Sequence, residues 1–165
     1  MCKCGNYGKD ENSDVRSGDA GEMPQYIGTK IIYARPFDEN DFNALKCNEM
    51  VENSRKGYLV RYADGYESWS PADVFEKAYR PCDAMNFGLA IEAMKMGKKV
   101  ARRGWNGKGI FIEIQNPDKN SKMTSSYIFI DTTGLQTDNP DAPKSRVPWL
   151  ASQTDMLSDD WVIVE

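Results

Sequence analysis

Histidine is missing from this chain of 165 residues. Its absence removes the commonest general base of enzymes, the usual Ser–His and Cys–His nucleophile pairs, and every metal site that uses imidazole. Long hydrophobic runs are missing too, since no apolar stretch approaches the roughly 18 residues of a membrane helix. Positive charge is scarce, because 21 basic residues face 25 acidic ones, and general nucleic-acid binders are usually basic. We therefore expect neither membrane association nor a nucleic-acid polymer as partner.

Cysteine is sparse and irregularly spaced. The four thiols are Cys2, Cys4, Cys47 and Cys82, and this spacing matches neither a zinc ribbon nor a Cys-x-x-Cys redox pair. One residue separates Cys2 from Cys4, which is too tight for an ordinary zinc knuckle. We expect reduced thiols in a reducing compartment, no bound metal and no cofactor.

Composition divides the chain into three parts. Residues 1–22 are polar and acidic, so they predict a flexible tail and not a signal peptide. Residues 23–83 predict a small β-rich module, an SH3-like barrel with one short helix. Residues 84–165 predict a small antiparallel sheet packed with one N-terminal helix. The expected fold class is therefore α+β. Each module alone would bury only about 60–65% of its unfolded surface, so either the two modules dock on each other or the protein oligomerises, and we expect oligomerisation.

The first module is organised around a hairpin. Asp64-Gly65 lies between the β-prone runs Tyr58–Tyr62 and Tyr66–Trp69, and glycine supplies the positive φ of a tight turn. The aromatic side chains of this hairpin have two interpretations, a peptide groove or the core of the module. Outside the hairpin, the sequence predicts a strand at Ile27–Ala34 and a helix N-cap at Ser70. Residues 36–55 are left unassigned.

The second module begins with an amphipathic helix. Asn86 is a good N-cap, Gly97 suits the position after the helix end, and the apolar residues between them recur at i, i+3, i+4 and i+7. This apolar stripe consists of Phe87, Ala90, Ile91 and Met94. Four short strands are expected next, at Lys99–Arg103, Ile110–Gln115, Tyr127–Asp131 and Trp161–Val164, the last at a buried position. Residues 132–146 form the longest expected loop.

The first candidate site is a basic, glycine-rich turn. Five positive charges lie within residues 98–108, and Trp105 stands among the glycines of positions 104–109. Glycine lets a ligand approach the backbone, tryptophan offers a face for a nucleobase, and lysine and arginine suit phosphate oxygens. This combination is typical of a nucleotide phosphate site, although it lacks the order of a Walker motif. The alternative is a hairpin turn beside a solvated basic face.

The second candidate site follows Trp149. Hydroxyl, amide and carboxylate groups come together at Ser152, Gln153, Thr154 and Asp155, and such groups can bind ribose hydroxyls and the edge of a base. The alternative is that Ser152 or Thr154 caps a short helical turn.

The third candidate is one face of the expected sheet. It alternates aromatic and acidic side chains at Phe111, Glu113, Tyr127, Phe129 and Asp131. A half-solvated face or a subunit interface explains this pattern better than an acid–base pair of Glu113 and Asp131.

Two long motifs carry a family resemblance. The first is Met85-Asn86-Phe87-Gly88-x-Ala90-Ile91-x-Ala93-Met94-x-x-Gly97-x-x-Val100-Ala101-Arg102-x-Gly104-Trp105-Asn106-Gly107-Lys108-Gly109, and the second is Trp149-Leu150-Ala151-Ser152-Gln153-Thr154-Asp155-Met156-Leu157-x-x-Asp160-Trp161. Together they resemble the second type of Thoeris anti-defence protein of bacteriophages, over residues 85–165. The chain departs from the family between Asp131 and Val147, where its loop is extended. Residues 23–80 resemble a short phage-encoded module of unknown activity.

The resemblance implies an anti-defence sponge and not an enzyme. Such a protein binds the glycocyclic ADP-ribose made by TIR-domain defence proteins, and in some members cyclic dinucleotides of CBASS defence, without cleaving them. The resemblance also implies a homotetramer in the host cytoplasm, with pockets at subunit interfaces and no catalytic residue. The implied ligand-binding residues are Arg102, Trp105, Asn106, Gly107, Lys108, Gly109, Phe111, Trp149, Ala151, Ser152, Gln153, Thr154 and Asp155.

We expect different parts of the ligand to meet different residues of this set. The two tryptophans would stack on the base, Lys108 and backbone amides would take phosphate, and Gln153 and Asp155 would take ribose hydroxyls. Two other functions stay open. One is an enzyme that degrades the cyclic nucleotide, with a carboxylate as base, and the other is an adaptor whose aromatic hairpin recognises a peptide.

Overall fold

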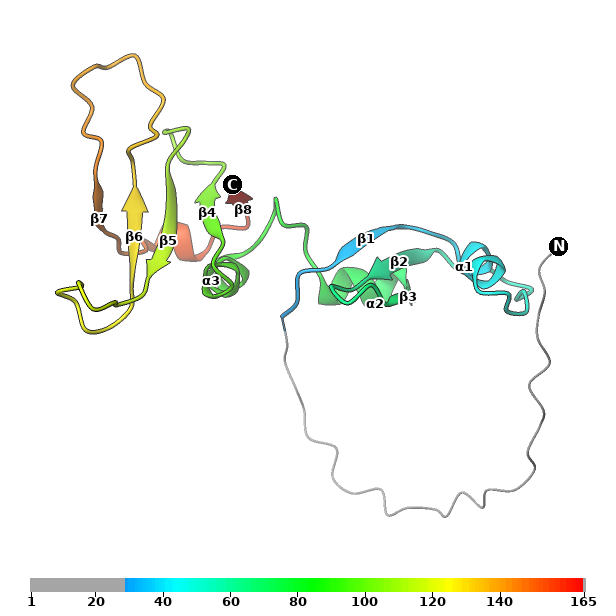
Figure 1. Ribbon diagram of the computed structural model, residues 1–165. Helices are drawn as coiled ribbons and strands as arrows, with labels where there is room; N and C mark the ends of the chain where they lie inside the picture. The colour runs from blue at the N-terminus through cyan, green and yellow to red at the C-terminus, as the bar shows by residue number, and fades with distance from the viewer. Residues whose placement is uncertain (1–28, 165) are drawn as a thin grey trace.

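The computed structural model describes residues 29–164, and within them it contains two separate antiparallel sheets, one in each half of the chain (Figure 1). The α+β class expected from the sequence is confirmed. The predicted tail of residues 1–22 and the pair Cys2 and Cys4 lie outside the described residues. No helix among the described residues has the length and apolarity needed to cross a membrane.

The first sheet is built on the predicted hairpin. Its strands pair in the order β1-β2-β3, and two short helices accompany them. Gly65 adopts a φ of 85° in the turn, and its N–H donates to the carbonyl of Tyr62. The elements are β1 (Tyr33–Pro36), α1 (Glu39–Leu45), β2 (Gly57–Arg61), β3 (Glu67–Pro71) and α2 (Ala72–Ala78).

Three expectations for this module were wrong. β1 begins only at Tyr33, near the end of the predicted strand Ile27–Ala34, and continues to Pro36, and α1 adds a second helix in the segment left unassigned. Residues 29–83 form an open three-stranded sheet, so the expected barrel is not closed by them. Ser70 is not a helix N-cap, because it pairs with Tyr58 inside the β2–β3 ladder, and α2 starts two residues later.

The aromatic side chains of the hairpin pack mostly within their own module. The ring of Tyr58 stacks on Phe75 of α2 with centroids 4.2 Å apart, and the indole Nε1 of Trp69 donates to the carbonyl of Phe37 at 2.8 Å. Tyr66 stays 64% exposed. These contacts favour the interpretation of the cluster as module core, with Tyr66 outside it.

The second sheet has five strands in the order β7-β6-β5-β4-β8. The elements are α3 (Phe87–Lys95), β4 (Lys99–Arg102), β5 (Phe111–Gln115), β6 (Tyr127–Asp131), β7 (Arg146–Pro148), α4 (Gln153–Met156) and β8 (Trp161–Val164). Strand β7 was not predicted; it begins at Arg146, the last residue of the expected loop, and ends at Pro148. Strand β8 is an edge strand, which corrects the buried position expected for it, although Trp161 at its start is fully buried.

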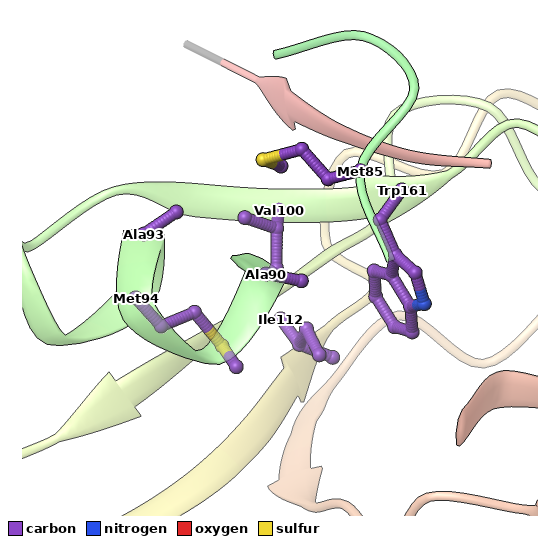
Figure 2. Packing of buried hydrophobic residues seen from close by; sticks show 7 residues of the cluster. All are labelled: Met85, Ala90, Ala93, Met94, Val100, Ile112 and Trp161. Atoms are coloured by element: carbon purple, nitrogen blue, oxygen red, sulfur yellow. The ribbon is translucent and has the colours of Figure 1, made fainter. Parts of the chain in front are cut away.

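Helix α3 begins and ends as the sequence predicts. The side chain of Asn86 accepts a hydrogen bond from the N–H of Leu89 at 2.9 Å, and Gly97 follows the helix with a φ of 78°. The buried side chains of α3 face Val100, Ile112 and Trp161, as Figure 2 shows. Because α3 packs on this face, the residues at alternate positions of β4, β5 and β8 form the core. The core therefore ends at Trp161, beside the second candidate site.

Candidate functional site

The second candidate motif forms the start of helix α4. Ser152 is its N-cap, and its Oγ accepts a hydrogen bond from the N–H of Asp155 at 3.1 Å. The carboxylate of Asp155 in turn accepts a hydrogen bond from the N–H of Ser152 at 3.0 Å. These reciprocal bonds form a capping box, so the helix-cap alternative for Ser152 is confirmed.

Asp155 also joins the two candidate motifs. Its Oδ1 accepts hydrogen bonds from Nη1 of Arg102 at 2.9 Å and from the indole Nε1 of Trp105 at 3.1 Å. Its Oδ2 accepts the hydroxyl of Ser152 at 2.7 Å. Both oxygens therefore have internal partners, and the side chain of Asp155 is only 12% exposed.

A second carboxylate completes this polar junction. Asp160 Oδ1 accepts from Nε of Arg102 at 2.8 Å, and its Oδ2 accepts from the N–H of Gly104 at the same distance. Arg102 thus spans Asp155 and Asp160, with its own side chain 12% exposed. The Arg102–Asp155–Asp160 cluster ties the start of the glycine-rich turn to α4 and to the residue before β8.

Aromatic rings form the apolar side of the junction. The centroids of Trp105 and Trp149 lie 6.1 Å apart at an interplanar angle of 63°, and both rings pack edge-on against Trp161. The indole Nε1 of Trp161 donates to the carbonyl of Asp155 at 3.0 Å. Phe87 of α3 contacts Trp149 and Trp161 from the helix side. The two sequence motifs therefore meet within a single chain.

The protein environment keeps the carboxylates of this cluster ionised. Burial opposes ionisation of Asp155, but hydrogen bonds from Ser152, Arg102 and Trp105 outweigh it and lower the pKa of Asp155 from 3.8 to about 2. The hydrogen bond from Arg102 likewise lowers the pKa of Asp160, and these carboxylates raise the pKa of Arg102. The cluster is charged at neutral pH and is a fixed part of the fold.

The glycine-rich turn meets the loop between β6 and β7 at its other end. Gly109 has a φ of 82°, and a Cβ on it would overlap the carbonyl oxygen of Gly134. Lys108 and Gln136 form an isolated antiparallel bridge, in which the N–H of Gln136 donates to the carbonyl of Lys108 at 2.9 Å. Leu135 lies over Gly107. The loop after β6 is thus docked on the turn.

The root of this loop is held by a third carboxylate, that of Asp131. Asp131 Oδ1 accepts the Thr133 hydroxyl at 2.6 Å, and its Oδ2 accepts Nε of Arg146 at 2.7 Å. These bonds, led by that from Thr133, lower the pKa of Asp131 to about 2. Asp131 lies opposite Phe111 in the ladder, and Glu113 opposite Phe129, so the structure pairs neither carboxylate with the other.

The candidate residues differ in what they offer to a ligand. The exposed members are Asn106, Lys108, Gly109, Ser152, Gln153 and Thr154, and the half-buried ones are Arg102, Trp105, Gly107, Phe111, Trp149 and Ala151. Phe111 stands apart, because it alternates with the core residue Ile112 and so points to the sheet face away from α3. On that face Lys99 Nζ lies 4.5 Å from its ring centroid.

Sequence reasoning missed three residues that build the site. Asp160, Trp161 and Phe87 hold the junction together, yet none was among the candidates. A signal was present, since all three stand within the two motifs. The pattern Ser152-x-x-Asp155 also has the spacing of a capping box, which predicts an internal partner for the carboxylate.

This domain is defined by helix α3 packed on a five-stranded antiparallel sheet. Two motifs that lie far apart in the sequence are joined beside that helix. The model of the Thoeris anti-defense 2-like domain matches residues 85–164, and the chain belongs to this family. A similar protein is Thoeris anti-defense 2 of Bacillus phage SP01, which is 34% identical over 93 residues. That alignment covers 48% of this chain and 94% of the phage SP01 protein.

Proposed function

We propose that this protein is a phage anti-defence protein that binds a cyclic nucleotide immune messenger and holds it without cleaving it. Membership of the Thoeris anti-defense 2-like family supports the anti-defence role. The observation that carries the binding proposal is the junction itself, where Trp105 and Trp149 lie 6.1 Å apart and the polar ends of both motifs stay exposed.

The exposed groups suit a compact anion with hydroxyls. Lys108 supplies positive charge for phosphate, and Asn106 supplies a carboxamide from the same turn. Gln153 and Thr154 at the start of α4 supply hydrogen bonds for ribose or base. Asp155 positions these groups in our proposal, because its oxygens already accept internal hydrogen bonds. The ligand that we infer is the TIR-derived glycocyclic ADP-ribose, with cyclic dinucleotides of CBASS defence as further ligands.

The proposal includes assembly of the chain into a homotetramer that acts in the host cytoplasm. A sponge must compete with a receptor for a scarce messenger, and a Kd near 10 nM requires about −11 kcal/mol. We call the exposed residues Asn106, Lys108, Gln153 and Thr154 the rim. The rim of a single domain encloses little of such a ligand, since tight small-molecule sites bury most of the ligand surface. A second subunit facing the rim supplies the missing wall.

Calorimetric titration with a panel of cyclic ADP-ribose isomers and cyclic dinucleotides tests the proposal, with the mass of the assembly measured in the same buffer. We expect tight binding of at least one member and recovery of that ligand intact after heat denaturation of the protein. New products at multiple turnover would instead identify an enzyme.

Lys108→Ala should weaken binding of that ligand, because an exposed cation of the rim is lost. Lys119→Ala is the matched control, since Lys119 is exposed in the loop between β5 and β6. Equal affinities of the two variants would contradict the placement of the ligand at this rim.

A further inference from the structure

The loop between β6 and β7 runs along the glycine-rich turn, and this path is the basis of the inference. The loop does not stand away from the domain, because Thr132 to Gln136 run alongside the glycine-rich turn. Gly109 and Gly134 approach so closely that a Cβ on Gly134 would lie 2.7 Å from the carbonyl oxygen of Gly109. Both positions thus require glycine, and this close approach fixes the loop against the turn.

The bridge at Lys108 and Gln136 sets where their side chains point. Residues directly opposite in an antiparallel pair carry their side chains on the same face, with Cβ atoms about 5 Å apart. Both residues are exposed. Within residues 29–164 the structure records no hydrogen bond to the carboxamide of Gln136, so its donor and acceptor are available to a ligand on the face that it shares with Lys108.

Lys108 and Gln136 offer different kinds of recognition. An ammonium attracts any phosphate, and it discriminates poorly between nucleotides. A carboxamide combines two donors with an acceptor and reads the arrangement of neighbouring groups, as in base or hydroxyl recognition. A site that binds a hydroxyl or amide group of one ligand rejects ligands that lack it.

We propose that Gln136 is a specificity-determining residue of the ligand site, brought beside the glycine-rich turn by the docked loop. The inference rests on the proposed function, since it concerns the same ligand. The Gln136 carboxamide contacts a hydroxyl or base edge next to the phosphate that Lys108 holds, and so it selects among cyclic nucleotides.

The test is titration of Gln136→Ala with the same panel of cyclic ADP-ribose isomers and cyclic dinucleotides. Loss of one neutral hydrogen bond corresponds to about a 2- to 12-fold weaker affinity. We expect this loss of affinity for the preferred ligand and little change for the other ligands. The ratio of the affinity for the preferred ligand to the affinity for the others should therefore fall. Asp138→Asn is the matched control, because Asp138 is exposed two residues further along the same loop, and it should leave the ratio unchanged.

Gly134→Ala gives a second measurement on the same contact. The added Cβ pushes the loop from the turn, so it should narrow the ratio of affinities as Gln136→Ala does. An equal loss for all ligands, or no loss, in Gln136→Ala would overturn the inference while leaving the proposed function in place. Failure of the unsubstituted protein to bind any panel member would overturn the proposed function, and the inference with it.

Discussion

The indole N–H of Trp105 donates to the carboxylate of Asp155 at 3.1 Å, although 50 residues separate them in the chain. The same carboxylate accepts a hydrogen bond from Arg102 and completes the capping box of α4 with Ser152. The geometry of the site is therefore set by a charged group inside the fold, and the groups left for a ligand are those around it.

Asp155→Asn should destabilise the protein by about 2–3 kcal/mol, because an amide nitrogen replaces one acceptor oxygen and the charged partner of Arg102 is lost. Chemical denaturation followed by tryptophan fluorescence measures the effect. Asp159→Asn is the control, since Asp159 is exposed nearby and outside the junction. Equal stabilities of the two variants would show that the junction does not support the fold.

Acid should destabilise the fold between about pH 4 and pH 2. The pKa values of Asp131 and Asp155 are about 2 in the folded protein and near 3.8 when unfolded, so the unfolded chain binds more protons in this window. Their contribution to stability is complete above pH 4 and is lost as pH falls through 2. Urea midpoints measured from pH 6 to pH 2 should show this decline, and Asp155→Asn should flatten it. A constant midpoint would contradict the low pKa values.

Gly109→Ala should destabilise more than Gly65→Ala. Both glycines have a φ above 80°, so each substitution costs about 1–3 kcal/mol in backbone strain. A Cβ at position 65 meets nothing within 4 Å, whereas at position 109 it overlaps Gly134. Denaturation midpoints compare the two variants, and the difference reports the contact between turn and loop. A smaller effect at position 109 would mean that the loop is not docked.

Gly57→Ala tests our proposal that the two sheets belong to separate modules. A Cβ at this position would overlap the carbonyl of Ser70 and the ring of Trp69, so β2 and β3 must separate. The NMR spectrum contains four indole N–H signals. In the variant, the signal of Trp69 should be lost at a lower denaturant concentration than in the unsubstituted protein, and the concentration at which the signal of Trp161 is lost should not change. Gly88→Ala in α3 is the control, since its Cβ would only touch Asn86. Simultaneous loss of the Trp69 and Trp161 signals would indicate one cooperative unit.

Local signals made much of the fold predictable. The Asn86 cap, the apolar stripe of α3 and the Asp64-Gly65 turn each depend on residues close in the chain, and all are present as expected. Helix α1 and strand β7 have no such signal. β7 forms because its three residues pair with β6, and a pairing across the long loop leaves no periodic pattern.

The candidate site was predictable in position and less so in the roles of its residues. The motifs located Trp105 and Trp149, which the structure brings together. They did not reveal the ion pair between Arg102 and Asp155. A charged residue in a motif can bind a ligand or an internal partner, and the sequence pattern is the same in both cases. Nor did they place Gln136 beside Lys108, since that contact depends on how the loop folds back.

Strand β7 has a consequence for how copies of this protein can associate. It is the outermost strand next to β6, spans only Arg146–Pro148 and ends in proline. Proline has no N–H to donate, and a short strand offers few open backbone groups to a neighbour. This border therefore resists the strand-by-strand joining that leads to fibrous aggregates.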